Sequence, residues 1–323
     1  MKVSVAIITY NQKKFIAQAI ESALAQQTDF DIEILVGDDC STDGTQEIIK
    51  AYQAQHPDKV RAVLHSKNLG QNGLFNTIET LKLAKGTYIA PMDGDDFWTD
   101  SLKLQKQVDF MDSHLGFSAC FHNALITYED GLDSHELNVP DQKLVTTIED
   151  LVGEDEVWFM ATSAVMFRNG LMYYPEWFLK SSSGDIPRYV VLAKYGPIGY
   201  VPRVMSVYRK NRGGASFKDH YRDARFLYNR IQMYKGINQE LDFKYNTILK
   251  RNIARYYRML LDARQYKKSY FRRAALTFKY LYWGKPDVET CKEVVRDYIL
   301  PKWLMSAYSF LALLPHRLKG TRR

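Results

Sequence analysis

The first 120 residues alternate between two hydrophobic periods, and this alternation limits the possible folds more than any other feature of the sequence. Short runs rich in β-branched or aromatic residues predict strands at 3–8, 32–36, 60–64 and 88–92. The stretches between them have apolar residues on one helical face, which predicts helices within 15–24, 48–52 and 76–84. Strands that alternate with helices are typical of βαβ units. We therefore expect an α/β domain with a mostly parallel sheet that is covered by helices on both faces.

Beyond residue 120 the pattern is less regular but still mixes both kinds of element. Strands are expected at 118–128, 164–167 and 199–208, and helices at 104–115 and 185–195. From Phe217 onward nearly every stretch has helical periodicity. The sequence thus predicts an α/β domain of residues 1–216 and a helical region of residues 217–323.

Charge divides the chain at the same place. Residues 217–323 contain 24 Lys and Arg against 9 Asp and Glu, a net charge of +15, whereas residues 1–216 have a net charge of −8. This asymmetry suggests that the helical region faces an anionic surface. Nucleic acid is not the expected partner, because no RNA- or DNA-binding motif accompanies the charge.

Cysteine usage and hydropathy argue against several classes of protein. The three cysteines are far apart and form no CxxC pair, which argues against a disulfide framework or structural zinc and for a reducing compartment. The chain opens with a strand pattern instead of a leader peptide, and no apolar run approaches the roughly 18 residues that a membrane span needs. A cytoplasmic location is therefore expected.

Polar residues follow four of the predicted strands, at the point where each strand ends. They are Thr9, Tyr10 and Asn11, then Asp38 and Asp39, then Asn68 and Gly70, and finally Asp93, Asp95 and Asp96. Ligands of open α/β sheets bind at the carboxyl ends of the strands, so these four segments predict a ligand site at one edge. The loops contain neither GxGxxG nor GxxxxGK[ST], which argues against a Rossmann or P-loop phosphate cradle.

The turn Asp93-Gly94-Asp95-Asp96 carries the most specific chemistry. Three carboxylates within four residues repel one another unless a cation neutralises them, and oxygen ligands suit Mg²⁺ or Mn²⁺. An isolated DxD sequence is more often an acidic surface turn, but this one directly follows a predicted buried strand. Asp38-Asp39 either binds a base or ribose or forms an Asx-type turn, and Tyr10 either stacks on a base or packs against the protein.

Four segments together resemble glycosyltransferase family 2. They are residues 3–11, 37–45, 68–70 and 93–96, which read VSVAIITYN, GDDCSTDGT, NLG and DGDD. The resemblance extends over about two thirds of the chain, residues 1–216. It implies a GT-A fold and an inverting, metal-dependent glycosyltransferase, with a nucleotide-sugar half at 1–120 and an acceptor half at 121–216.

The resemblance also implies roles for individual residues. The nucleotide-sugar pocket would consist of Thr9, Tyr10, Asn11, Asp39, Asn68, Gly70, Asp93 and Trp98. Within it, Tyr10 would stack on the nucleobase, Asp39 would hydrogen-bond the base, and Trp98 would lie near the sugar. Asp95 would ligate Mn²⁺ or Mg²⁺ between the phosphates, and Asp93 would contact the ribose or the metal.

Inversion requires a general base that takes the proton of the attacking acceptor hydroxyl. In the family this base is an acidic residue that opens a helix well after the DxD motif, and Asp185 is the matching position. The alternative is that Asp185 only stabilises the helix dipole.

Some positions depart from the family or stay open. Asn211 stands where relatives often have His, so any role of that histidine with metal or diphosphate is lost, moved or weakened here. The neighbouring Arg209, Lys210 and Arg212 either meet the diphosphate or form a solvated basic loop. His122 and Asn123 are candidates for the acceptor side, with a satisfied, partly buried histidine as the expected role of His122.

The expected function is transfer of a sugar from a nucleotide-sugar to a hydroxyl of a glycan or lipid-linked glycan, in cell-surface polysaccharide or glycolipid synthesis. UDP is the expected nucleotide, with dTDP and GDP as alternatives. Two other functions remain open, a non-catalytic, membrane-associated nucleotide-binding protein and a sugar nucleotidyltransferase. The second is disfavoured because Thr9-Tyr10-Asn11-Gln12 is not the Gly-rich, basic loop of such enzymes.

The last stretch of the sequence combines aromatic and basic residues. Residues 303–314 include Trp, Tyr, Phe and Leu, and residues 317–323 include Arg and Lys. This composition suits an interfacial helix on the anionic inner face of the cell membrane. The alternative is a helical appendage that packs on the catalytic domain and has a solvated basic face.

Overall fold

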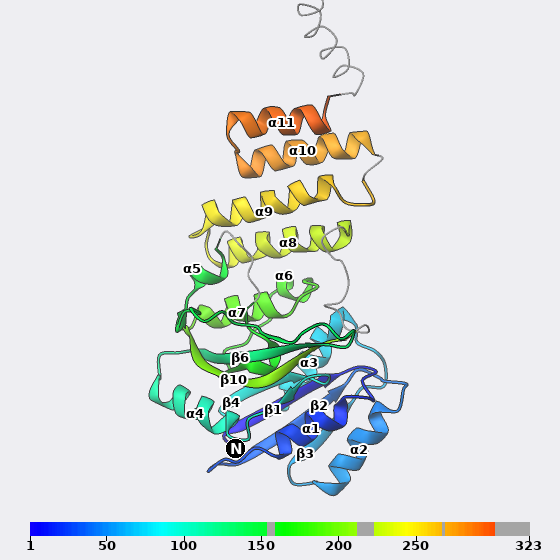
Figure 1. Cartoon of the computed structure of the whole chain (residues 1–323), viewed down its shortest axis with the longest axis vertical. Helices are drawn as coiled ribbons and strands as arrows, with labels where there is room; N and C mark the ends of the chain where they lie inside the picture. Colours follow the sequence, from blue (N-terminus) through cyan, green and yellow to red (C-terminus); the bar gives the residue numbers. More distant parts are fainter. Residues whose placement is uncertain (154–158, 212–222, 267–268, 301–323) are drawn as a thin grey trace, which may run out of the picture. The chain divides into compact units, whose positions relative to one another are not determined.

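The structure is a computed structural model of the chain, and it describes residues 1–153, 159–211, 223–266 and 269–300. The chain divides into two compact units, Met1–Lys218 and Asp219–Arg323. The described part of the first unit contains a sheet with flanking helices, and that of the second consists of helices and their connections (Figure 1).

One sheet of ten strands runs through the described part of the first unit. The strands are β1 (Val3–Thr9), β2 (Ile32–Asp38), β3 (Val60–Leu64), β4 (Tyr88–Asp93), β5 (Phe97–Trp98), β6 (Ala119–Tyr128), β7 (His135–Glu136), β8 (Val145–Thr146), β9 (Val165–Arg168) and β10 (Ile198–Lys210). Their order is β3-β2-β1-β4-β9-β6-β10-β5, with β7 paired to β6 and β8 to β10. β3, β2, β1 and β4 are parallel neighbours, as the alternating pattern predicts, while β9 is antiparallel to β4 and β6.

The parallel register brings distant polar residues to one edge of the sheet. Thr9 lies opposite Asp38, and Ile8 lies opposite Asp93 on the other side of β1. The chain therefore leaves β1, β2 and β4 at the same edge, and the loops that follow these strands meet there.

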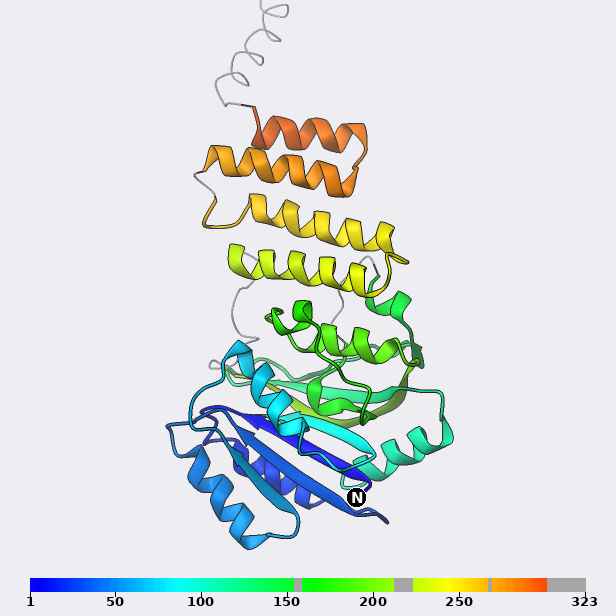
Figure 2. The ribbon, with the colours of Figure 1, turned by 180° about the vertical axis from the view of Figure 1, so that it is seen from behind.

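Helices cover both faces of the sheet (Figures 1 and 2). One face is covered by α1 (Ile16–Leu24), α2 (Thr45–Gln55) and α4 (Lys103–Ser113), and the other by α3 (Leu74–Leu81) and α7 (Asp185–Ala193). Helix α3 approaches β2 very closely at Gly37, where a Cβ atom would lie 2.1 Å from Thr80 Oγ1. Only glycine fits there, which explains the Gly that precedes Asp38-Asp39.

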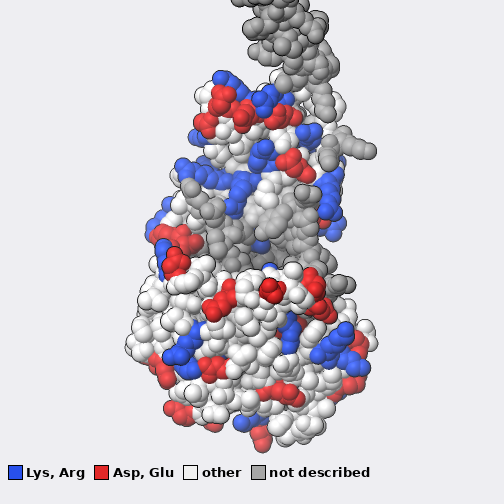
Figure 3. Space-filling model, viewed as in Figure 1, with Lys and Arg blue, Asp and Glu red and all other residues white. Residues whose placement is uncertain are grey.

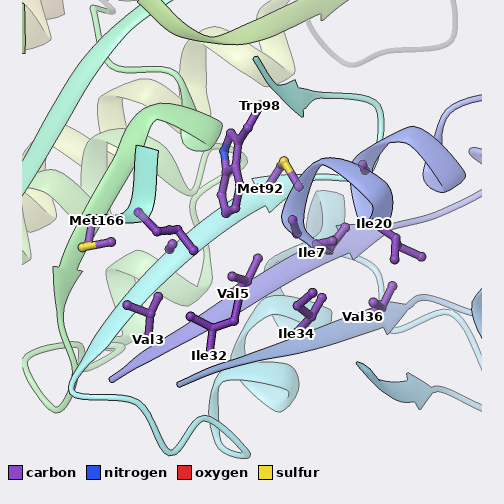
Figure 4. Packing of buried hydrophobic residues seen from close by; sticks show 14 of the residues in the cluster. Val3, Val5, Ile7, Ile20, Ile32, Ile34, Val36, Met92, Trp98 and Met166 are labelled. Atoms are coloured by element: carbon purple, nitrogen blue, oxygen red, sulfur yellow. The ribbon is translucent and has the colours of Figure 1, made fainter. Parts of the chain in front are cut away.

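The main core lies between the sheet and α1, α2 and α4. Val3, Val5 and Ile7 of β1 pack with Ile34 of β2 and Ile20 of α1, all without exposed surface (Figure 4). Burying each such side chain contributes about 1.5–3 kcal/mol, so this cluster holds the strands whose ends carry the polar loops.

The second unit is built from α8 (Ala224–Glu240), α9 (Asn246–Leu261), α10 (Tyr270–Gly284) and α11 (Val288–Tyr298). Consecutive helices pack on one another through buried residues such as Leu227, Ile231, Ile253, Leu260 and Leu276. Two helices begin at aspartate caps, because Asp223 accepts from the amides of Arg225 and Phe226, and Asp287 accepts from that of Thr290. In the part of the chain that the structure describes, none of the helices is both long and apolar enough to cross a bilayer.

Several short elements lack a counterpart in the sequence prediction. They are β5, β7, β8, α5 (Ile148–Leu151) and α6 (Glu176–Leu179), and the 3₁₀ turns η1 (Gln71–Gly73) and η2 (Thr162–Ala164). A strand of two residues or a helical turn of three or four is too short to repeat its hydrophobic period, so the pattern does not reveal it. Helix α3 also begins at Leu74 and ends at Leu81, a few residues before the predicted bounds.

Candidate active site

The loop after β1 is tied to the loop after β2. Asn11, whose φ is +52°, accepts a 2.8 Å hydrogen bond at Oδ1 from the Thr42 amide, and its own amide donates to Ser41 Oγ. Thr9 is buried, and its hydroxyl donates to Gln12 Oε1. Thr9 and Asn11 therefore shape the site by holding the loop after β1 in place.

The two neighbouring aspartates after β2 have different surroundings. Asp38 accepts hydrogen bonds from the Ser41 amide and hydroxyl and from Gln46 Nε2, which makes it the internal turn residue. Asp39 Oδ1 accepts from the Leu69 amide at 2.7 Å, and its Oδ2 has no hydrogen-bond partner among the described residues. Of the pair, Asp39 is the residue with an acceptor left for a ligand.

The third loop completes this part of the site. Asn68 donates to the Asp39 carbonyl and accepts from the Gly70 amide, and Gly70 adopts a φ of +78°. Tyr10 is 49% exposed, so its ring is available for stacking. The structure thus brings Tyr10, Asp39, Asn68 and Gly70 to the edge that the sequence predicts.

The acidic turn is pinned against β1. The Gly94 amide donates to the Ile8 carbonyl at 2.8 Å. A Cβ atom at Gly94 would lie 2.6 Å from Gln12 Oε1 and 2.8 Å from Thr9 Cβ, so the turn can lie this close only with glycine. Asp93 and Asp95 belong to the end of β4 and the turn after it, and the Gly94 contacts therefore also hold them next to the end of β1.

The carboxyl groups of this turn raise one another's pKa values. Burial and the carboxylates of Asp95 and Asp185 raise the pKa of Asp93 to about 7. Burial and its two acidic neighbours raise the pKa of Asp96 well above its ordinary value, and burial raises that of Asp95. Crowded carboxyls with raised pKa values are a place where a cation stabilises the ionised forms.

The end of β10 reaches the acidic turn. The Asn211 side-chain amide donates a 2.6 Å hydrogen bond to Asp95 Oδ2. Arg209 donates from Nη1 to the Asp95 carbonyl at 2.7 Å and from its backbone amide to Asp96 Oδ1 at 3.0 Å. Arg209 is therefore part of the site's framework rather than of a solvated loop, whereas Arg212 lies outside the described residues.

The donor atoms suit a hard cation, although the protein supplies few of them. Asp93 and Asp95 offer carboxylate oxygens, which Mg²⁺ and Mn²⁺ prefer. In the described ranges, no group of three or more His, Cys, Asp or Glu side chains is placed to hold a metal on its own. A cation here would need further ligands from phosphate oxygens or water, as is usual for Mg²⁺ at nucleotide sites.

The predicted base lies beside the acidic turn. Asp185 begins α7, its side chain is 28% exposed, and it accepts a 3.3 Å hydrogen bond from Thr162 Oγ1. Thr162 also lowers the pKa of Asp93. Arg188 Nη1 lies 3.6 Å from Asp185 Oδ1, and its charge also lowers the pKa of Asp93.

Thr162 and Arg188 are site residues that the sequence prediction missed. Thr162 lies in η2, which has no periodic signal. Arg188 could have been found, because residues three apart on a helix share a face and Asp185 begins α7.

Trp98 needs a correction. It is only 4% exposed, belongs to the main core cluster and donates from Nε1 to the Ser163 carbonyl at 2.8 Å. Because its short strand β5 pairs with β10, the indole packs inside the sheet unit, which is at odds with direct contact to a sugar.

His122 is also a core residue. It has no exposed surface, and burial lowers its pKa to about 3. Its Nδ1 lies 2.8 Å from the Asn123 carbonyl, and Asn123 is itself buried and donates to Glu136. This pair therefore matches the buried alternative for His122.

A pocket of about 280 Å³ adjoins Asp95. It is lined by Tyr10, Asn11, Gln12, Lys13, Lys14, Phe15, Asp43, Asp95, Glu129 and Asn211. Lys13 and Lys14 place positive charge beside the Asp95 carboxylate, which suits a ligand that carries both phosphate and a bound cation.

Comparison with known proteins reveals relatives of the first unit. Residues 4–173, more than half of the chain, match the family described as Glycosyl transferase family 2. An uncharacterized protein of Mycobacterium tuberculosis is 33% identical over 220 residues, which cover 65% of this chain and 59% of that protein. The chain thus spans less than two thirds of the length of this relative. WfaP of Escherichia coli, named a UDP-Glc:alpha-D-GlcNAc-diphosphoundecaprenol beta-1,3-glucosyltransferase, is 38% identical over 115 residues, which cover 36% of this chain and 43% of WfaP.

Two solved structures share the fold. S. aureus TarS 1-349 in complex with UDP-GlcNAc is 18% identical, with a TM-score of 0.55 over 88% of this chain and 91% of that fragment. The mannosyltransferase PcManGT from Pyrobaculum calidifontis, in complex with GDP-Man and Mn²⁺, is 17% identical, with a TM-score of 0.51 over 99% of this chain and 83% of that one. The sheet, its helices and the family match agree, and the predicted GT-A fold is confirmed. The chain belongs to glycosyl transferase family 2.

Proposed function

We propose that this protein is an inverting, metal-dependent glycosyltransferase that moves a sugar from a nucleotide-sugar, expected to be UDP-linked, to a hydroxyl of a cell-surface glycan or glycolipid. One observation carries the proposal. Asp185 begins α7 and accepts a hydrogen bond from Thr162, and its carboxylate raises the pKa of Asp93 in the acidic turn. A candidate base beside the candidate diphosphate site is the arrangement that sugar transfer requires.

The edge of the parallel sheet would bind the nucleotide. Tyr10 stacks on the base, and the Asp39 oxygen that has no partner among the described residues accepts a hydrogen bond from the base. Asn68 holds the Asp39 backbone, and Gly70 leaves open space beside it. These supports stand before any ligand arrives, so binding does not have to order them.

The acidic turn would bind the diphosphate end of the donor. Asp95 and Asp93 hold the cation, and Asn211 fixes the Asp95 carboxylate. When bound, Mn²⁺ or Mg²⁺ supplies positive charge that stabilises the departing diphosphate. The names of the relatives support this choice, since TarS binds UDP-GlcNAc and PcManGT binds GDP-Man with Mn²⁺.

Asp185 would act as the general base. Its carboxylate takes the proton of the acceptor hydroxyl as that oxygen attacks the anomeric carbon. The bond from the anomeric carbon to the diphosphate oxygen breaks on the opposite side, and its electron pair leaves with the diphosphate. The anomeric configuration is therefore inverted. Thr162 and Arg188 hold the Asp185 carboxylate in place during this step.

The acceptor is proposed from chemistry and relatives together. WfaP carries the name of an enzyme that acts on a diphosphoundecaprenol-linked sugar. A lipid-linked glycan at the inner face of the cell membrane would place the acceptor hydroxyl where a cytoplasmic peripheral enzyme can reach it. The tail segment that the sequence assigns to this membrane contact, residues 303–323, lies outside the described residues.

A donor screen tests the proposal. Nucleotide release from UDP-, dTDP- and GDP-sugars with Mn²⁺ should identify one preferred donor, and the product should have inverted anomeric configuration by NMR. Asp185→Asn should lower transfer by about 100-fold or more while UDP affinity persists. Asp133→Asn, at an exposed aspartate of the same unit, is the matched control. Retained configuration, or a wild type that binds UDP but turns over no donor, would contradict the proposal and favour a non-catalytic nucleotide-binding protein.

A further inference from the structure

Helix α10 of the second unit presents a row of aromatic side chains to solvent. Phe271, Phe278 and Tyr282 are 85%, 62% and 74% exposed, and Ala275 between them is exposed as well. At about 100° of rotation per residue, these four positions fall within an arc of roughly 60° on the helix. We call Phe271, Ala275, Phe278 and Tyr282 the α10 stripe. Single exposed apolar residues are ordinary, but four in one row need an explanation.

The α10 stripe is not the face that holds the helix in its unit. Leu276 and Thr277 are buried, and Tyr280 is half-buried on the same side. These residues lie opposite the stripe, where α10 packs against α9 and α11. The packed face is therefore already complete without the stripe.

The charged residues of α10 itself are all cationic. They are Arg272, Arg273 and Lys279. Arg272 and Lys279 are exposed, lie seven residues apart, and therefore run along one side of the stripe. On the face that Figure 3 shows, the second unit carries patches of Lys and Arg together with clusters of Asp and Glu.

We propose that the α10 stripe lies in the headgroup region of an anionic lipid bilayer. Phenylalanine and tyrosine favour the depth of the headgroups, and flanking cations gain from anionic lipid within a Debye length. A second copy of this chain is a less favourable partner for the stripe, because pairing two such faces would bring Arg272 and Lys279 close to the same cations of the other copy. This surface is distinct from residues 303–323, and its argument rests on α10 alone.

Flotation of the full chain with vesicles tests the proposal. Wild-type protein should float with vesicles of phosphatidylcholine containing phosphatidylglycerol, and much less with phosphatidylcholine alone or at high salt. The variant Phe271→Ser/Phe278→Ser/Tyr282→Ser should partition at least ~10-fold less, because each lost aromatic contact weakens insertion. Arg272→Glu/Lys279→Glu should lose binding to the anionic vesicles in the same way.

The matched control is Leu115→Ser, which removes a 78% exposed apolar side chain from the first unit and should leave flotation unchanged. Circular dichroism and a melting curve check that each variant folds. If the triple variant does not fold, the single variant Phe278→Ser replaces it, and its loss of flotation should be several-fold smaller. Unchanged flotation of a folded stripe variant would overturn the proposal. The proposal would also be overturned if the wild type is a dimer that the stripe variant converts to a monomer while flotation stays unchanged. That result would assign the stripe to contact with a second copy of the chain.

This experiment is separable from the test of the proposed function. Donor turnover is measured without vesicles, and flotation is measured without donor. A stripe variant that releases nucleotide at the wild-type rate but does not float supports both proposals, and loss of turnover in Asp185→Asn leaves flotation untouched.

Discussion

Asn211 at the end of β10 donates a 2.6 Å hydrogen bond to the Oδ2 atom of Asp95 in the acidic turn. The two residues are 116 positions apart in the chain, and the contact occurs at the position where the family resemblance implies a histidine. A histidine could share a metal ligand's role, whereas an amide donates a hydrogen bond to the carboxylate and so orients it. Asn211 thus replaces a possible ligand with a residue that positions one.

Removing this amide should weaken the cation site. In Asn211→Ala, the Asp95 carboxylate loses its 2.6 Å hydrogen bond. The concentration of Mn²⁺ that gives half-maximal activity should then rise by about 10- to 100-fold, because this is the usual effect of losing a residue that orients a metal ligand. The measurement is a Mn²⁺ titration of donor turnover. Binding of uridine, which has no diphosphate, is the internal control and should not change. An unaltered Mn²⁺ requirement would show that the contact is only structural.

The Thr162 hydroxyl should matter for turnover and not for donor binding. Thr162→Val keeps the shape but removes the hydrogen bond to Asp185, so kcat should fall by about 3- to 10-fold at an unchanged donor KM. Thr162→Ser restores a hydroxyl and should recover most of the rate. If valine and serine behave alike, Thr162 acts through packing instead.

Two glycines offer a matched test of the acidic turn. Gly94→Ala places a Cβ within 2.6 Å of Gln12 Oε1, so the turn must move away from β1 and donor affinity should fall by at least ~10-fold. Gly116→Ala is the control, because a Cβ there meets no atom within 4 Å. Calorimetric titration with UDP and Mn²⁺ compares the two, and equal affinities would contradict the role given to the turn.

Lys103 should make stability depend on pH. It has no exposed surface, its Nζ lies 3.9 Å from the centre of the Trp98 ring, and this atom has no hydrogen-bond partner among the described residues. Burial lowers the pKa of Lys103 from 10.5 to about 7. Between these values the unfolded chain binds more protons at this site than the folded chain, so the free energy of unfolding rises with pH across that window.

The variant Lys103→Met should therefore be more stable than the wild type near neutral pH. Removing a buried polar group that has no hydrogen-bond partner should raise the free energy of unfolding by about 1–3 kcal/mol. Each kcal/mol raises Tm by about 2–4 °C in a domain of this size. Melting curves at pH 7 and pH 9.5 should show the difference shrinking at the higher pH. Lys82→Met, at a 61% exposed side chain, is the control and should show no such trend. A lower Tm for Lys103→Met at pH 7 would mean that the ammonium group stabilises the fold through Trp98.

The sequence reveals the parts of the site that follow directly from strand ends. Asp93 and Asp39 could be predicted because each ends a strand with a clear hydrophobic period, and parallel strands deliver their ends to one edge. Asp185 could be predicted to begin a helix because an apolar helical pattern follows it, and the structure places it at the start of α7. Its chemical role stays a prediction.

The remaining contacts depend on pairing between distant segments, which a single sequence does not encode locally. Thr162 precedes β9 in a 3₁₀ turn, and its position depends on the pairing of β9 with β4 and β6. The family resemblance implies that Trp98 lies near the sugar, whereas in the structure β5 pairs with β10 and the indole belongs to the core cluster. The different roles of Asp38 and Asp39 also depend on contacts in the folded chain. Asp38 accepts hydrogen bonds from Ser41 and Gln46, whereas Asp39 accepts one from Leu69.

The position of β10 has a practical consequence for dissecting this enzyme. The stretch with family similarity stops at residue 173, before α7 and β10. A fragment cut at that point would retain β1 to β4 but would lack Asp185, Arg188, Arg209 and Asn211, the groups that contact the acidic turn or lie beside it. Such a truncated protein would expose the flank of β6 that β10 normally covers, and it would also have no means of holding Asp95 in place. Boundaries for expression or domain exchange therefore belong after Asn211.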